Sequence, residues 1–469
     1  MFSDKKNFTI IWLFIVISSV ISGFILYFDF DKPYYYKLLP LLPFVFGLIN
    51  LFFLMLYRNI LSNIALTLVI GLYYIRFVIV PLIMMMGNYS SFLKFNISSN
   101  INYGIVLMVY ELIIVYVVMY YSERKHKKAN RKIHVKFEGK KLPSLFRPIL
   151  MCLLFFCIII LIAIPESRQL YSSLFTSLNK TSVDIVSIDS FAERGGLKRA
   201  LLTLYGLTME VIRLLIPAYI IIFIRKKIGN KITGIMLSIP IVLAQFLLVS
   251  NTHARSIICA VILILLLAKL YPDWSKKLYK ISFLFGLLFV LIYFTTKINS
   301  PISNSSNTGL EYASEIANAY FSGPDNIAAT FNVESDEQIK TLIYTLVSAI
   351  PFNGTIFGLS GNNYSALYNN FNMAEFQIGP LISESYYYLG AIFAPIISAV
   401  IVVLAIKYGN KAKYETNIWK YIAYIYLVII LAASLVMYNG TILMKTVTGV
   451  IIPLLIVANL TSKRAIKND

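Results

Sequence analysis

The sequence predicts an all-α membrane protein that crosses the bilayer with about twelve helices. Of its 469 residues, 58% are hydrophobic and only 14% are charged, and the mean hydropathy is +0.74. A soluble chain of this length has a more ordinary composition. The apolar residues also recur in runs of about 20, the length that spans a bilayer as a helix. We therefore predict a single transmembrane domain over residues 1–469.

The apolar runs give the expected spans, with boundaries accurate to about two to four residues. The first run is too long for a signal peptide and lacks a small-residue cleavage site, so we expect it to be retained. Pro81 predicts a kink or a tilt in the long third run. The predicted spans are 8–27, 38–57, 61–86, 101–121, 148–165, 201–224, 232–250, 256–271, 281–296, 380–406, 419–437 and 441–459.

The distribution of basic residues predicts the orientation. Most of the 42 Lys and Arg residues fall in segments that lie on one side if the N-terminus is cytoplasmic, and the basic loop 122–147 is the densest of them. Loops rich in Lys and Arg stay inside the cell. Both termini are therefore expected in the cytoplasm, with two long extracytoplasmic loops at 166–200 and 297–379.

The net charge of +20 has the same topogenic cause, since the basic residues face anionic headgroups, and it does not indicate nucleic-acid binding. The three cysteines, Cys152, Cys157 and Cys259, all fall in predicted spans. This pattern predicts no disulfide framework and no metal site.

The second long loop is expected to fold as a cap on the membrane surface. Two stretches have helical character, 310–321 and 338–350, and the breaker 322–325 separates them. The loop is also rich in aromatic residues, which disordered segments lack. Its mixture of aromatic and small polar residues fits either an interfacial belt or stacking on sugar rings. Tyr34–Tyr36 are explained by the belt alone.

Basic residues on the outer side, where they are otherwise scarce, suggest an anion site. Arg194 and Arg199 close the first long loop, just above the span that begins near residue 201. The short turn Asn251–Ser256 carries His253 and Arg255 at the top of the bilayer. Arg binds phosphate oxygens in a bidentate fork, and His is a proton acceptor. Headgroup contact or a plain turn remains the alternative interpretation for these residues.

Ionisable residues inside the spans are costly and are normally paired or functional. Arg76 and Glu111 lie at similar depth on adjacent antiparallel spans, so they are expected to pair. Glu210 and Arg213 are three apart on one helix and could pair as well, which would make them structural; a functional role under the basic end of the first long loop is the alternative. Glu384 lies one turn into the span that opens with Gly379-Pro380. There its carboxylate either caps that helix N-terminus or serves the chemistry.

The order of several motifs resembles the bacterial repeat-unit polymerases of O-antigen and capsular polysaccharide, the Wzy type. The resemblance covers roughly residues 190–400, its motifs are loose, and the first four spans match nothing specific. The motifs are Ala254-Arg255-Ser256, Tyr320-Phe-Ser-Gly-Pro324, Ile350-Pro351 and Gly379-Pro380 followed by Glu384-Ser-Tyr and Leu389-Gly390.

The resemblance implies a glycosyltransferase with a GT-C-like architecture in the bacterial cytoplasmic (inner) membrane. It would need no cofactor and no metal, and it would join lipid-linked oligosaccharides carried on polyprenyl diphosphate. Arg194, Arg199, Arg213 and Arg255 would stabilise the leaving diphosphate, and His253 or Glu384 would deprotonate the acceptor hydroxyl. Tyr320 and Tyr386 would contact the glycan. The implied partners are the lipid-linked glycan, the bilayer and a chain-length regulator protein.

Two other functions fit the same membrane topology. One is a flippase or transporter for lipid-linked sugars, although the halves 1–230 and 231–469 show no matching interrupted helices of the kind that transporters repeat. The other is a ligase that moves a finished glycan to another acceptor.

Overall fold

The computed structural model is helical over almost all of its described length. It describes residues 2–60, 63–93, 98–129, 146–164, 167, 171–172, 196–246, 249–250, 253–275, 277–278, 309–334, 337–348, 350, 363–373 and 377–462. Within these residues, eight helical segments are long and apolar enough to cross a membrane. The chain is therefore a polytopic α-helical membrane protein. The eight segments are Thr9–Tyr27, Tyr34–Phe52, Ile64–Met86, Ile101–Lys125, Phe146–Ala163, Ala200–Ile228, Pro395–Tyr414 and Gly440–Leu460.

Seven of these segments coincide with predicted spans to within a few residues. The N-terminal half of the chain contains α1 (Phe2–Tyr27), η1 (Tyr34–Tyr36), α2 (Leu41–Phe52), α3 (Leu54–Ile60), α4 (Ile64–Tyr74), η2 (Ile75–Ile79), α5 (Val80–Met86), α6 (Ile101–Ala129), α7 (Phe146–Ala163), β1 (Tyr171–Ser172) and α9 (Gly196–Ile228). The predicted span 281–296 lies outside the described residues, as does most of the basic loop. The first residues of that loop, 122–129, continue α6.

The C-terminal half contains the two shorter apolar helices of the bundle, α10 and α20. Its elements are α10 (Ile232–Leu243), η6 (Ala244–Phe246), β2 (Val249–Ser250), α11 (His253–Leu270), η7 (Pro272–Trp274), α13 (Gly309–Tyr320), α14 (Pro324–Ala328), η8 (Ala329–Asn332), α15 (Gln338–Ser348), α17 (Tyr364–Phe371), α18 (Leu381–Phe393), α19 (Pro395–Tyr414), α20 (Ile418–Ser434), α21 (Gly440–Thr446), η9 (Val447–Ile451) and α22 (Ile452–Ser462). The strands β1 and β2 form one short antiparallel pair.

Two spans contain a π-helical turn, and each turn lies just before a proline. The segment η2 precedes Pro81, and η9 precedes Pro453. Proline has no N–H to give to the carbonyl four residues earlier, so the preceding turn widens to a different hydrogen-bond spacing. The expected irregularity near Pro81 is thus a π-turn.

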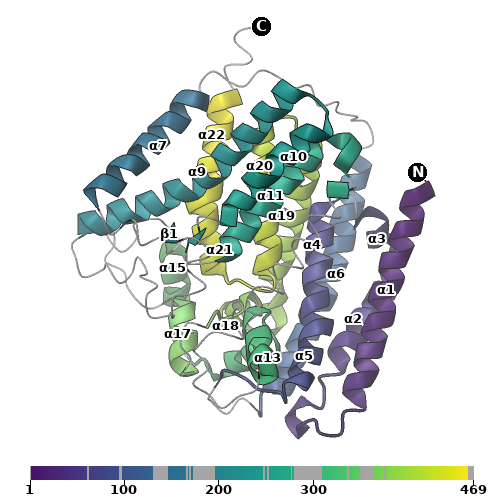
Figure 1. The fold of residues 1–469 in the computed structure, drawn as a ribbon. Coiled ribbons are helices and arrows are strands. Elements are labelled where there is room, and N and C mark those ends of the chain that lie inside the picture. Colours follow the sequence, from purple (N-terminus) through teal and green to yellow (C-terminus); the bar gives the residue numbers. More distant parts are fainter. Residues whose placement is uncertain are drawn as a thin grey trace.

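Helix α20 forms the centre of the bundle. Almost every residue from Trp419 to Ser434 is buried, and the helix packs against α19, α4 and α11. A helix that is apolar on all sides and buried on all sides belongs in a core. In Figure 1, α1 and α2 form a layer at one flank of the bundle, and α7 and α9 lie at the other.

The predicted single span 380–406 is wrong, because the chain turns within it. Gly390 has a φ of 75° inside α18, a conformation that side-chain-bearing residues rarely adopt. The candidate crossing begins only after this turn, at Pro395. The residues before it, α18 with Glu384, lie outside the eight candidate spans.

The helices α13, α14, η8, α15, α17 and α18, here called the cap, gather at one end of the bundle, and the start of α1 and the end of α22 lie at the other (Figure 1). The segments expected to be helical in this region correspond to α13 and α15, and the chain breaks between α13 and α14 at Ser322, which has a φ of 48°.

A buried carboxylate links the cap to the first two helices. Tyr36, expected in an interfacial belt, is only 2% exposed, and its hydroxyl donates to Asp325 Oδ1 over 2.7 Å. Asn318 donates to the other oxygen of Asp325. Burial raises the pKa of Asp325 to about 6, and these hydrogen bonds oppose the shift. The belt interpretation is therefore wrong for Tyr36, because it pairs with α14 instead of facing lipid.

Candidate functional site

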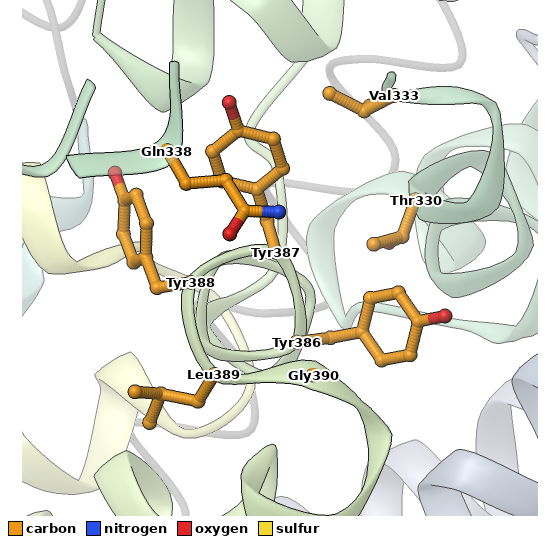
Figure 2. Close-up of a pocket in the computed structure, with 8 residues that line it drawn as sticks. All are labelled: Thr330, Val333, Gln338, Tyr386, Tyr387, Tyr388, Leu389 and Gly390. Carbon is orange, nitrogen blue, oxygen red and sulfur yellow. The ribbon is translucent and has the colours of Figure 1, made fainter. Parts of the chain in front are cut away.

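A pocket lined by tyrosines lies in the cap, between α18, η8 and the start of α15. Its volume is about 420 Å³, within the range of about 300–1,000 Å³ usual for small-ligand sites. Three consecutive residues, Tyr386–Tyr388, fan out from α18 in Figure 2. Tyr386 packs edge-on against Phe331 with ring centroids 5.0 Å apart. The other lining residues are Thr330, Val333, Gln338, Leu389 and Gly390.

Several buried hydroxyl groups in and behind this pocket have no hydrogen-bond partner within the described part of the chain. They belong to Ser383, Ser385, Tyr387 and Thr441. A buried hydroxyl without a partner costs free energy, so such groups are rare in native structures and mark places where a ligand or water completes the bonding. The pocket therefore combines aromatic rings with unused polar atoms, a surface suited to a polyhydroxylated ligand.

Glu384 lies one turn before the pocket tyrosines on α18 and is 3% exposed. Its Oε2 accepts a hydrogen bond of 2.6 Å from the backbone N–H of Gly440, the first residue of α21. A Cβ at position 440 would lie only 2.8 Å from that oxygen, so glycine permits the close approach. The alternative that Glu384 caps the N-terminus of its own helix is therefore wrong. Glu384 caps α21 instead, and the N-cap of α18 is Pro380.

The pKa of the Glu384 carboxyl group lies near neutral pH. Burial raises its pKa to about 7, and the N–H of Gly440 opposes the shift. Oε1 makes no hydrogen bond to any described residue. A carboxylate fixed by one oxygen, with the other unused and a pKa near the working pH, has the properties of a general base.

The connection between α20 and α21, residues 435–440, links this carboxylate to the rest of the bundle. Gly440 binds Glu384, and Asn439 donates to Ser365 Oγ on α17. Asn439 also caps α21 by accepting from the N–H of Ile442. The connection is thereby tied to both α17 and α18 of the cap.

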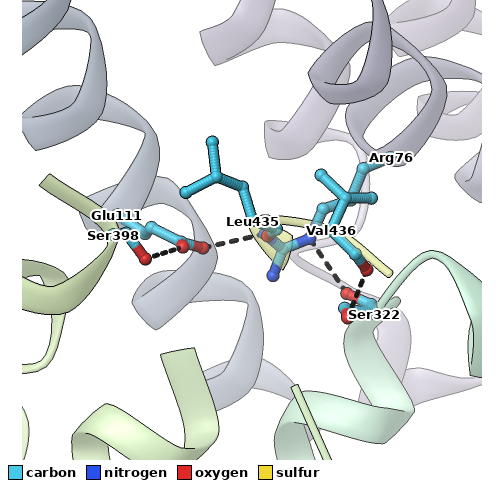
Figure 3. A network of polar contacts seen from close by, with 6 residues as sticks. All are labelled: Arg76, Glu111, Ser322, Ser398, Leu435 and Val436. Atoms are coloured by element: carbon cyan, nitrogen blue, oxygen red, sulfur yellow. Dashed lines mark hydrogen bonds and ion pairs between the residues drawn. The ribbon is translucent and has the colours of Figure 1, made fainter. Parts of the chain in front are cut away.

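The other end of the same connection is tied to the buried ion pair between Arg76 and Glu111, whose expected pairing is confirmed at 2.8 Å (Figure 3). Arg76 also donates to the carbonyl oxygens of Leu435 and Ser322, and Ser322 Oγ donates to the carbonyl of Val436. Removing one partner of a buried pair leaves an uncompensated charge, so this network holds the connection rigidly. Its role is structural.

Arg213 provides a buried cation on α9. Its Nη2 donates to the carbonyl of Gln245 over 2.6 Å and to Ser256 Oγ, while Nη1 is buried and has no partner among the described residues. The expected pair between Glu210 and Arg213 is not formed there. The reason is that η6 and α11 approach α9 at this height and offer each side chain a partner of its own.

Glu210 pairs instead with Arg255 of α11, at 3.2 Å. The Arg255 side chain is 50% exposed and that of Glu210 only 2%, so a carboxylate orients a guanidinium that is half exposed. Arg255 also interacts electrostatically with Tyr438 of the α20–α21 connection. Tyr438 and Gly440 are two residues apart, a chain span of at most about 7 Å. Arg255 and Glu384 therefore flank the same short segment.

The other predicted cations and His253 are described only in part or not at all. Arg199 lies in the first turn of α9, and the 14 residues to Arg213 correspond to about 21 Å along a helix, beyond the reach of an arginine side chain. Its side chain and the whole of Arg194 lie outside the described residues. His253 is the first residue of α11, and its ring is likewise not described.

The two predicted glycan-contacting tyrosines occupy different places. Tyr386 lines the pocket, whereas Tyr320 ends α13, outside the pocket, and interacts electrostatically with Tyr438. The site also includes residues that the sequence analysis did not single out, namely Thr330, Gln338, Tyr438, Asn439 and Gly440. Only Asn439-Gly440 carried a usable signal, because Asn before an apolar run predicts a helix N-cap.

The start of α11 lies next to the short strand pair. It follows β2, which pairs with β1, and β1 lies near mid-height of the bundle in Figure 1. Arg255 is the third residue of α11 and so lies in the first turn of that helix.

Comparison with known proteins assigns the chain to no family, since no family model, no curated protein and no solved structure matches it. A functional assignment therefore depends on the geometry and chemistry of the site.

Proposed function

We propose that this protein is a polysaccharide polymerase of the bacterial cytoplasmic membrane, a glycosyltransferase that moves a polyprenyl-diphosphate-linked glycan onto an incoming lipid-linked repeat unit. One observation supports the proposal: the α20–α21 connection interacts with Arg255 through Tyr438 and binds the carboxylate of Glu384 through Gly440, while Arg213 binds Ser256, the neighbour of Arg255. A transfer from a diphosphate needs these two functions, charge stabilisation at the leaving group and a base at the acceptor.

In the proposed reaction an acceptor hydroxyl attacks the anomeric carbon of the donor sugar. The new glycosidic C–O bond forms while the bond from that carbon to the diphosphate oxygen breaks. The hydroxyl proton passes to Glu384, whose pKa of about 7 suits the task. The diphosphate takes the bonding electron pair, and Arg255 with the buried Nη1 of Arg213, which is unpaired among the described residues, stabilises its charge. Glu210 holds Arg255 in position.

The tyrosine pocket supports the same assignment, because it would hold the acceptor sugar next to Glu384. Its rings offer apolar faces to a sugar, and its unused hydroxyls and the Gln338 amide offer hydrogen bonds. A chain-length regulator protein is a further proposed partner.

Lipid analysis of a strain that lacks this gene tests the proposal against its two alternatives. We expect single repeat units on polyprenyl diphosphate, exposed on the outer face of the membrane. Units that stay on the cytoplasmic face would indicate a flippase. Finished polymer that stays on polyprenyl diphosphate would indicate a ligase. Either of these last two outcomes would overturn the proposal.

A further inference from the structure

Helix α15 (Gln338–Ser348) presents an exposed row of apolar side chains, here called the apolar stripe. Its members are Ile339, Leu342, Ile343, Leu346 and, just beyond the helix, Ile350. They recur at helical spacing and so occupy one face. Ile339 is 77% exposed and Ile343 is 55% exposed. Large apolar patches of this kind on a protein surface mark a contact with a membrane or another protein.

The opposite face of α15 is fixed to the rest of the protein. Thr341 and Thr345 are buried. Thr345 Oγ1 lies 2.8 Å from the hydroxyl of Tyr388 and accepts the backbone N–H of Tyr364. The helix is thus held by its threonine face, and its direction is set by α17 and α18. The apolar stripe therefore points away from α17 and α18, because the opposite face of the helix contacts them.

The neighbours of α15 determine what lies in front of the stripe. The helix packs beside α21, the first part of the candidate span Gly440–Leu460 (Figure 1). That span exposes apolar residues of its own, such as Met444 and Ile452. Since a membrane span exposes apolar side chains to lipid, the stripe lies beside a segment whose exposed apolar residues are expected to face acyl chains.

The charged residues of α15 mark the edge of this surface. Glu337 and Lys340 form an exposed ion pair of 3.0 Å at the start of the helix, off the apolar stripe. An amphipathic helix with an apolar face and a charged margin is typical of a segment that lies in the membrane interface.

We propose that α15 is a membrane-inserted helix, with its apolar stripe in the lipid leaflet on the cap side and its Glu337–Lys340 pair at the headgroups. Because Gln338 of α15 and Tyr388, which binds Thr345, both line the tyrosine pocket, this insertion brings the pocket to the lipid surface. A ligand anchored in the bilayer would then reach the pocket sideways, without leaving the membrane. The insertion itself does not depend on the proposed function.

Fluorescence quenching in lipid vesicles tests the insertion without any assay of activity. The full-length protein, with Cys152, Cys157 and Cys259 replaced by alanine, receives one cysteine, Ile343→Cys, labelled with an environment-sensitive dye. We expect nitroxide-labelled lipids to reduce its emission more than aqueous iodide does. Lys340→Cys on the same helix is the matched control and should show the reverse preference. A Leu346→Cys variant repeats the measurement on the stripe.

The native Cys152 serves as the lipid-facing reference, because it is exposed on the candidate span Phe146–Ala163. A protein that keeps only this cysteine should lose emission to the lipid quencher. If the dye at 343 loses emission mainly to iodide, α15 lies in water and the inference is overturned. Shielding of positions 343 and 346 from both quenchers would overturn it as well, because a second copy or another protein would then cover the stripe.

Discussion

Replacement of Glu384 by Gln is expected to reduce glycan transfer by about 10²–10⁴-fold, the usual contribution of a general base. Gln is nearly isosteric and keeps an oxygen that accepts the N–H of Gly440, so the α20–α21 connection should remain in place. It cannot take up the acceptor proton. The measurement is the rate at which the purified protein in vesicles extends lipid-linked repeat units.

The matched control is Glu315→Gln, which alters another largely buried carboxylate of the cap. This variant should fold and retain transfer. Full activity in Glu384→Gln would show that Glu384 only caps α21 and would remove it from the reaction.

The pH dependence of stability and of the transfer rate provides a second test of the role of Glu384. Its pKa is raised from 4.5 to about 7 in the folded state. The folded protein therefore binds this proton more tightly than the unfolded chain, and the free energy of unfolding falls as the pH rises between these values. Transfer should rise over pH values near 7 as the base deprotonates. In Glu384→Gln the rise in the rate profile should disappear, whereas the fall in unfolding free energy should only weaken, because Asp325 with its pKa of about 6 keeps part of it. Rate profiles and thermal unfolding measure the two effects.

Replacement of Arg213 or Arg255 by Gln is expected to lower transfer by about 10²–10³-fold, the usual effect of removing one donor at a site of developing negative charge. Arg255→Lys should recover only part of the rate, because Lys keeps the charge but loses the planar fork. Arg213→Gln is also expected to weaken the contact between α9 and α11. Thermal unfolding of each variant separates this effect from the loss of transfer.

Arg225→Gln is the control on the same helix. Arg225 donates to the carbonyl of Leu270 and stacks on Tyr271, far along α9 from Arg213. Its loss should reduce the stability of the protein. The transfer rate per folded molecule should remain unchanged. Normal polymer yield and length in cells carrying Arg213→Gln and Arg255→Gln together would contradict the role of these cations.

The sequence was most informative where hydrophobicity decides the structure. Apolar runs located the candidate spans, and the equal depth of Arg76 and Glu111 on adjacent spans predicted their ion pair. An ionisable group inside a bundle must find a partner. Two oppositely charged residues at the same depth have few other partners within reach.

The sequence was least informative where a single backbone conformation or a backbone group decides the structure. Apolar residues continue through 381–406, so hydropathy does not reveal the turn at Gly390. The spacing of Glu210 and Arg213 predicted a local pair, but α11 supplied Arg255 from far along the chain. The α20–α21 connection contributes mainly carbonyl and N–H groups. No side-chain pattern identifies these groups before the helices are assembled.

The most direct test of the central claim is a reconstitution with the purified full-length protein and labelled lipid-linked repeat units in vesicles. We expect products of two and more repeats, with one polyprenyl diphosphate released for each bond formed, and no such products with Glu384→Gln. Repeat units that remain single while the label crosses the bilayer would contradict polymerisation and identify a transporter.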